Sequence, residues 1–283
     1  MKPPKRKVDT VVLSDIHLGT YGCHAKELLR YLKTIDAKTI VLNGDIIDIW
    51  QFNKRYWPQS HMHVVKHFTG LIAQGVKVHY ITGNHDEMLR KFVGFKMGSF
   101  EISNKLILKQ DGQTSWIFHG DVFDVTMKHS KWLAKLGAIG YDILILMNRF
   151  VNFISEKLGR GKISLSQRVK NEVKSAISFI NDFEQTAADI AIDKGYDNVI
   201  CGHIHQPTTK KMENESGSCM YLNSGDWIEN LTALEYNHGK WTLYKYQEDA
   251  VVREIDLSQY HLEVQKNKDL FEGLLTEFKL LAS

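Results

Sequence analysis

The stretch VVLSDIHLGT, residues 11–20, is an apolar run followed by an acid, a histidine and a glycine. Short β-branched runs of this kind are typical of buried strands, so a strand is expected over residues 10–13. Asp15 and His17 then lie at the tip of that strand. A carboxylate in such a place is costly unless something positive pairs with it, so the stretch predicts a positive partner for Asp15.

The chain continues with short β-branched runs that alternate with helical patterns. Strands are expected over residues 39–42 and 76–81, with helices over residues 25–34 and 61–73. Alternating strands and helices predict βαβ units in a layered α/β core. Further strands are expected over residues 115–118, 198–201, 220–222, 231–236 and 241–246.

Four more of these expected strands end as the first one does, in a glycine-bearing turn that presents Asp, Asn or His. The turns read NGDIID, TGNHDE, HGD and GHIH. Open α/β sheets hold their ligands at the carboxyl ends of strands, so the five strand ends are expected to meet at one site. The candidate ligands that they present are Asp15, His17, Asp45, Asn84, His119, His203 and His205.

Oxygen donors mixed with imidazole suit Mn²⁺, Fe or Zn²⁺, and the lack of thiolates argues against a structural zinc site. The candidates outnumber what one ion needs, so two ions that share a carboxylate are the economical interpretation. Two divalent ions about 3.5–4 Å apart polarise phosphoryl oxygens and supply the nucleophile for an in-line displacement. His85 lies next to Asn84 and is placed to bond a phosphate oxygen or protonate the leaving group. Asp48 or Asp86 is expected to orient it.

The ordered series DIH, GDIID, GNHD, HGD and GHIH resembles the calcineurin-like metallophosphoesterase superfamily in order and in every ligand type. The resemblance implies a four-layer α/β fold, a β-sandwich flanked by helices, rather than one doubly wound sheet. It also implies that Asp45 bridges two metal ions, manganese in first place and iron or zinc as alternatives. The first ion is then held by Asp15, His17 and His205, and the second by Asn84, His119 and His203.

Within that superfamily the chain is most similar to the UDP-2,3-diacylglucosamine hydrolases of lipid A biosynthesis. The similarity extends to GDIIDIW, GHIHQP and YLNSGDW. It implies hydrolysis of a pyrophosphate bond in an acylated sugar nucleotide, which releases UMP and a lipid X-type product. Those hydrolases usually carry arginine where this chain has His85. A soluble phosphodiesterase or phosphatase that acts on another small phosphate substrate therefore stays an alternative.

Residues 125–194 are expected to form a helical hairpin inserted into a core made of residues 1–124 and 195–283. Its two helices are expected around residues 131–158 and 166–192, and the second has an apolar stripe that the first is expected to cover. The first helix, with GAIGYDILILMNRFVNFI, fits either plain packing of the hairpin or a lid over the acyl chains of a substrate. The candidate substrate contacts are Trp50, Arg149, Arg160 and Lys162.

The helical stretch 61–73 carries three histidines, and two of them, His63 and His67, are spaced four residues apart. That spacing can bind a metal, but the HExxH pattern is lacking. We therefore expect His61, His63 and His67 on a solvated helix face.

The composition bounds the remaining possibilities. The chain has 283 residues, 43% of them hydrophobic, and 36 basic against 33 acidic residues, a balance that gives no reason to expect nucleic-acid binding. The basic start KPPKRK fits a solvated terminus or attraction to an anionic membrane surface. Three widely spaced cysteines favour a reducing compartment, and no apolar stretch reaches the roughly 18 residues of a membrane span. We expect a cytoplasmic protein, soluble or peripheral to the inner membrane.

Overall fold

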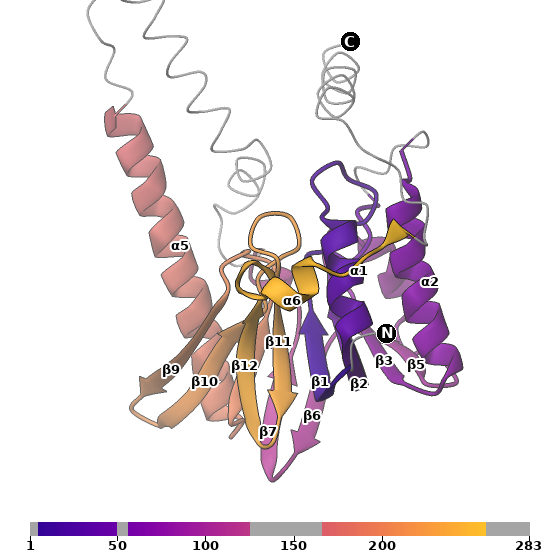
Figure 1. Ribbon diagram of the computed structural model, residues 1–283. Helices are drawn as coiled ribbons and strands as arrows, with labels where there is room; N and C mark the ends of the chain where they lie inside the picture. Colours follow the sequence, from indigo (N-terminus) through magenta and orange to yellow (C-terminus); the bar gives the residue numbers. More distant parts are fainter. Residues whose placement is uncertain (1–4, 50–55, 125–165, 259–283) are drawn as a thin grey trace, which may run out of the picture.

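The computed structural model describes residues 5–49, 56–124 and 166–258, with side chains described from residue 177 onwards in the last range (Figure 1). Two sheets form the centre of the molecule. The seven-stranded sheet has the order β12-β11-β1-β2-β3-β5-β4, and the five-stranded sheet has the order β6-β7-β8-β10-β9. The four-layer α/β architecture expected from the resemblance is confirmed, and a single doubly wound sheet is excluded.

The seven-stranded sheet is built on three parallel strands, β1 (Arg6–Leu13), β2 (Ile35–Asn43) and β3 (Lys77–Ile81). The sheet is completed by β4 (Lys96–Met97), β5 (Phe100–Ser103), β11 (Thr232–Asn237) and β12 (Lys240–Lys245). The five-stranded sheet contains β6 (Leu106–Gln110), β7 (Gln113–Ile117), β8 (Asn198–Cys201), β9 (Thr208–Asn214) and β10 (Gly217–Asn223). The expected strands are present, several of them longer than expected, whereas β4, β5, β6 and β9 are not among the expected elements.

The apolar run of β1 is continuous because both faces of the strand are buried. Val11 belongs to the core between the seven-stranded sheet and its helices, and Val12 belongs to the core between the two sheets. A half-exposed strand would alternate apolar and polar residues instead. This strand therefore delivers Asp15 and His17 to the interior edge of the sandwich.

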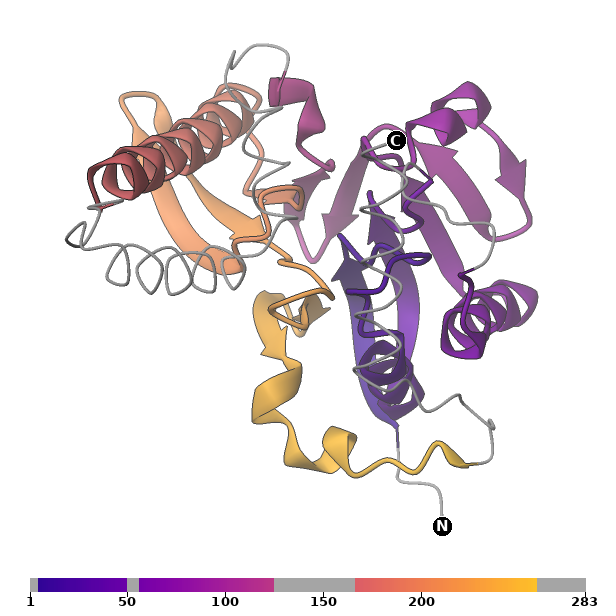
Figure 2. The ribbon, with the colours of Figure 1, turned by 90° about the horizontal axis from the view of Figure 1, so that it is seen from above.

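Helices cover the outer faces of both sheets (Figure 2). α1 (Ala25–Thr34) and α2 (Gln59–Ala73) pack on the seven-stranded sheet through residues such as Leu28, Leu32 and Phe68. Short helical segments complete the described structure: η1 (Glu87–Phe92), η2 (Asp121–Asp124), η3 (Tyr246–Glu248) and α6 (Ala250–Arg253). Within the described ranges, no helix is long and apolar enough to cross a membrane.

The long helix α5 (Ser166–Asp193) covers the five-stranded sheet. Phe183 and Ala187, both from its apolar stripe, are buried in one core with Val199 and Tyr221 of that sheet. In this part of the helix the stripe therefore has a sheet as a partner, which the expected hairpin did not include. The first helix of the hairpin, and with it Trp50, Arg149, Arg160 and Lys162, lies outside the described residues, and the division into core and insertion stays a prediction.

Candidate metal centre

The backbone at the strand ends has an uncommon conformation. Asp15, His17, Asp45, His203 and His205 all have positive φ angles, between 51° and 67°. Side chains other than glycine rarely adopt this left-handed region, which costs about 1–3 kcal/mol per residue and persists only where the surroundings hold it. Such strain gathers at functional sites, and here it affects five of the seven candidate ligands.

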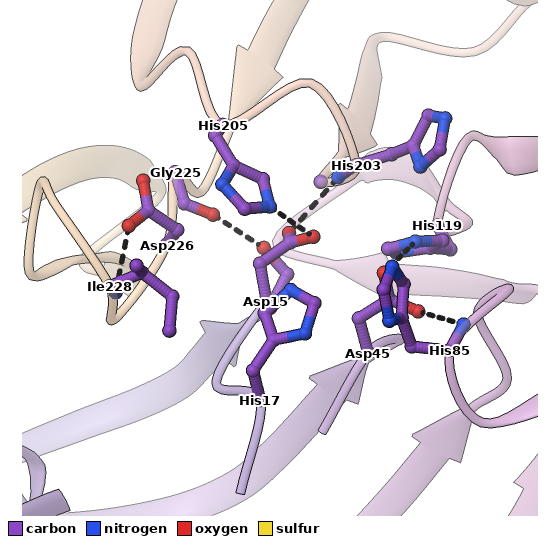
Figure 3. Close-up of polar contacts among 12 residues, drawn as sticks. Asp15, His17, Asp45, His85, His119, His203, His205, Gly225, Asp226 and Ile228 are labelled. Carbon is purple, nitrogen blue, oxygen red and sulfur yellow. Dashed lines mark hydrogen bonds and ion pairs between the residues drawn. The ribbon is translucent and has the colours of Figure 1, made fainter. Parts of the chain in front are cut away.

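One group of candidates is formed by Asp15, His17 and His205, whose possible ligand atoms all lie within 4.8 Å of one another. Nε2 of His205 lies 3.2 Å from Oδ1 of the fully buried Asp15 (Figure 3). Burial by itself lowers the pKa of His205, but the Asp15 carboxylate outweighs it and raises that pKa to about 9. The negative field that attracts this proton also attracts a cation.

A second group is formed by Asp45, His119 and His203, again within 4.8 Å. Nδ1–H of His119 donates to the carbonyl of Asn43 at 2.9 Å, which leaves Nε2 to face the group. That Nε2 lies 3.3 Å from Oδ2 of Asp45 and 3.3 Å from Oδ1 of Asn84. The structure thus brings together all seven candidate ligands, and a further possible group, formed by His17, Asp48 and His85, shares His17 with the first group.

Glycines allow the turns to approach one another so closely. A Cβ on Gly83 would lie 2.2 Å from Oδ1 of Asp45, and one on Gly202 would lie 2.6 Å from Oδ2 of Asp15. A Cβ on Gly44 would meet the ring of His119 at 2.3 Å. These contacts explain why glycine precedes the polar residues in the GD, GN and GH pairs.

His85 contacts one of the two carboxylates that were expected to orient it. Its Nδ1 lies 2.9 Å from Oδ2 of Asp48, and Nδ1 of His17 lies 3.2 Å from the same oxygen. Asp48 is almost completely buried, and although burial opposes its charge, its bonds to both imidazoles hold its pKa well below the usual range. Burial likewise opposes the protonated form of His85, but Asp48 raises the pKa of His85 above its ordinary value.

Asp86, the other expected orienting group, has a different place. It is fully buried, and its carboxylate accepts the backbone N–H groups of Ile46 and Gly83 and the hydroxyl of Tyr80, at 3.0, 2.6 and 2.6 Å. These bonds tie the turn after β2 to the turn after β3. The contact to His85 therefore belongs to Asp48, and Asp86 braces the two turns.

The expectation of a solvated face for the histidines of α2 is wrong for His61. This side chain is buried, with 2% exposure, and its Nδ1 accepts the N–H of Gly19 at 2.9 Å. The bond supports the turn that carries His17. Sequence reasoning missed this role because the pattern around His61 gives no sign of its distant partner.

The chemistry of the cluster fits divalent metal ions. Nε2 of His17 is buried and has no hydrogen-bond partner among the described residues, a costly state unless a cation meets it. Carboxylate, amide and imidazole donors suit first-row divalent ions, and all three are present. The fold and this cluster define a metal-dependent hydrolase of phosphate esters.

The chain belongs to the calcineurin-like phosphoesterase family, whose model matches residues 9–207. It is 24% identical over 238 residues to the UDP-2,3-diacylglucosamine hydrolase of Aliivibrio fischeri, covering 82% of this chain and 96% of that relative. Identity to the hydrolase of the same name from Blochmanniella pennsylvanica is 26% over 234 residues, or 80% of this chain and 90% of that one. Among solved structures, Yfce, a phosphoesterase from E. coli, is 14% identical, with a TM-score of 0.43, and the match covers 84% of this chain and 93% of that chain.

Proposed function

We propose that this chain is a dinuclear pyrophosphohydrolase that cuts an acylated sugar nucleotide of the UDP-2,3-diacylglucosamine type and releases UMP. The observation that carries the proposal is the convergence of all seven candidate ligands in two adjacent groups. Curated relatives of that name match at least four fifths of the chain and support the substrate class.

In this proposal Asp15, His17 and His205 hold one ion, Asn84, His119 and His203 hold the other, and Asp45 bridges both. Manganese is the proposed metal, with iron or zinc as alternatives, because the donor set accepts each of them. When bound, such a pair of ions polarises the phosphoryl oxygens and supplies the nucleophilic water of an in-line displacement.

His85 is the proposed catalytic group outside the ligand set. Its side chain is partly exposed, with 20% exposure, whereas the Asp48 carboxylate behind it is buried. Asp48 contacts Nδ1 and favours the protonated ring, and Nε2 is the atom that we propose bonds a phosphate oxygen or donates a proton to the leaving oxygen. Asp48 acts here as a positioning residue.

Contact with a membrane surface is part of the proposal. Half of the ten large apolar side chains that are exposed within the described ranges fall in residues 88–97, right after the His85 turn. They are Met88, Phe92, Val93, Phe95 and Met97, with exposures of 43–56%. The basic residues Arg90, Lys91 and Lys96 are interleaved with them. Apolar side chains mixed with long basic ones suit the boundary between acyl chains and headgroups, where an acylated substrate resides. Peripheral association with the cytoplasmic side of the inner membrane follows from this proposal.

One observation favours a second candidate function. His85 stands where arginine is usual in the lipid A hydrolases, and GNHD is the general phosphoesterase pattern. A soluble phosphodiesterase or phosphatase acting on a small substrate accounts for that residue. Trp50, Arg149, Arg160 and Lys162 remain the proposed contacts to the larger, acylated substrate.

Hydrolysis assays on the manganese-loaded protein distinguish the two functions. UDP-2,3-diacylglucosamine in mixed micelles and bis(p-nitrophenyl) phosphate in detergent-free buffer serve as substrates, with Asp45→Asn as the inactive control. We expect release of UMP from the acylated substrate at a kcat/KM well above that for the diester. Turnover of the diester with none of the acylated substrate would establish the second function instead.

A further inference from the structure

We propose that residues 223–230, named here the brace segment, set the metal affinity of the group formed by Asp15, His17 and His205. The brace segment connects β10 to β11 and includes most of the YLNSGDW motif, but it supplies none of the proposed ligands. Its positioning residues are Asp226 and Asn230. The inference rests on the proposed function only in taking Asp15 and His205 as metal ligands.

The brace segment holds the backbone next to Asp15. The N–H of Trp227 donates to the carbonyl of Asp15 at 3.0 Å. The hydroxyl of Ser14 donates to the carbonyl of Gly225 at 2.8 Å and lies 2.6 Å from the hydroxyl of Ser224. All three partners are buried, so no solvent competes for these bonds. The turn after β1 is therefore fixed from this side.

The same segment holds the backbone next to His203 and His205. The side-chain amide of Asn223 donates to the carbonyl of Gly202 at 2.8 Å, and that of Asn230 donates to the carbonyl of His205 at 3.0 Å. β1 belongs to the seven-stranded sheet and β8 to the five-stranded one. The brace segment thus joins the ligand turns of the two sheets.

Asp226 organises the brace segment internally. Its carboxylate is fully buried and accepts the backbone N–H groups of Ile228, Glu229 and Asn230 on Oδ1. Its Oδ2 accepts the side-chain amide of Asn230 at 2.5 Å. An amide group has two N–H donors, and those of Asn230 are divided between Asp226 and the carbonyl of His205. Asp226 therefore determines where Asn230 points. Figure 3 shows Asp226 with its bond to the N–H of Ile228.

The ligands need this support because their backbone is strained. Asp15 and His205 both have φ of 51°, a conformation that persists only when neighbouring groups hold it. Without the bond from Asn230, the His205 turn can relax toward an ordinary conformation and carry the imidazole away from Asp15. Partners that hydrogen-bond metal-ligating side chains typically alter metal affinity 10- to 100-fold when they are lost. Asn230 acts on the backbone of the ligand His205, and we expect an effect in the same range.

The test is a Mn²⁺ titration of the metal-free full-length protein, read by calorimetry and by electron paramagnetic resonance. His205→Ala and His119→Ala first identify which binding event belongs to which group of ligands. Asn230→Ala is then expected to weaken the event that His205→Ala removes, by 10- to 100-fold, and to leave the other event unchanged. The matched control is Asn237→Ala. This substitution also removes a hydrogen bond from a side-chain amide to a backbone carbonyl, that of Lys7 at 3.2 Å, but away from the site.

A second variant keeps the inference testable should Asn230→Ala fold poorly. Asp226→Asn is nearly isosteric and retains one oxygen to accept the backbone N–H groups. Its new NH2 group cannot accept the hydrogen bond that the side-chain amide of Asn230 donates to Oδ2 of Asp226. We expect the same selective loss of affinity, and no further loss when Asn230→Ala is added, because the two residues act as one unit. Unchanged affinity in folded variants, equal loss at both binding events, or an equal effect of Asn237→Ala would each overturn the inference.

The titration needs no substrate, so its outcome is separate from that of the proposed function. Selective loss of Mn²⁺ in a protein that does not cut the acylated substrate would support the brace segment and refute the proposed substrate. Normal Mn²⁺ binding by Asn230→Ala and Asp226→Asn, in an enzyme that does cut the acylated substrate, would refute the role of the brace segment and support the proposed substrate.

Discussion

Nδ1 of His85 lies 2.9 Å from Oδ2 of Asp48, which is itself buried and shielded from solvent. Because the proposed ligand set excludes His85, replacing it should impair the reaction without removing an ion. We expect His85→Ala to lower kcat by about 10²–10⁴-fold with both ions retained. Metal analysis of the purified variant beside steady-state kinetics checks this prediction, and loss of one ion would identify His85 as a ligand instead.

Asp45 is the proposed bridge, and its pKa lies well below the usual range because nearby histidines, His119 first, outweigh the effect of burial. We expect Asp45→Ala to abolish turnover and to reduce the bound metal. Asp9 lies in the middle of β1 and forms an exposed ion pair with Lys38, so Asp9→Ala is the matched control and should leave both unchanged. Near-normal turnover by Asp45→Ala would contradict the bridging role.

Gly83 provides a purely steric test of the site. A Cβ at this position would lie 2.2 Å from Oδ1 of Asp45, whereas a Cβ on Gly70 of α2 would meet nothing within 4 Å. We expect Gly83→Ala to displace Asp45 and to lower metal occupancy and kcat together. Gly70→Ala should retain full activity and raise the free energy of unfolding by about 0.5–1 kcal/mol, because alanine is the better helix former. Similar behaviour of the two variants would show that close packing at Gly83 is unimportant.

We expect the exposed apolar residues after the His85 turn to contribute to membrane binding. Phe92→Ser/Phe95→Ser should weaken binding to phosphatidylglycerol vesicles, measured by co-sedimentation, while hydrolysis of a soluble diester is retained. Val251→Ser is the matched control, because Val251 is 66% exposed but lies on α6. Equal vesicle binding by the double variant and the control would place the membrane contact elsewhere. A change of oligomeric state on gel filtration would instead identify this surface as an interface between copies of the chain.

We expect His67 of α2 to make the free energy of unfolding depend on pH. Burial, reinforced by the charges of Lys33 and Lys5, lowers the pKa of His67 to about 4 from an ordinary value of 6.5. Between these two pH values the unfolded chain binds the proton and the folded chain does not, so the free energy of unfolding falls as the pH drops from 6.5 to 4. Urea unfolding of His67→Gln across this range should show a shallower fall than the wild type. Parallel curves would mean that other groups cause the acid sensitivity.

The order of elements and the chemistry of the ligands were predictable from local pattern. A short run of β-branched apolar residues such as Val11 and Val12 favours a buried strand. A glycine before Asp45 and before Asn84 indicates a tight turn. Whether Asp48 or Asp86 serves His85 was not predictable, because both carboxylates are close to it in the motif and their directions depend on how two turns meet. The partner of the α5 stripe was likewise undetermined, since an apolar face fits a helix as well as a sheet.

The sequence by itself thus determined which residues can bind metal and at which strand ends they lie, because periodicity, turn chemistry and donor type are local properties. Only the tertiary structure decided that Asp48 rather than Asp86 contacts His85, why His61 is buried under the His17 turn, and how residues 223–230 tie Asp15 to His205. These contacts join residues up to about 200 positions apart in the chain, such as Asp15 and Trp227. The contacts of residues 223–230 exist only because the two sheets pack face to face and bring their strand ends together.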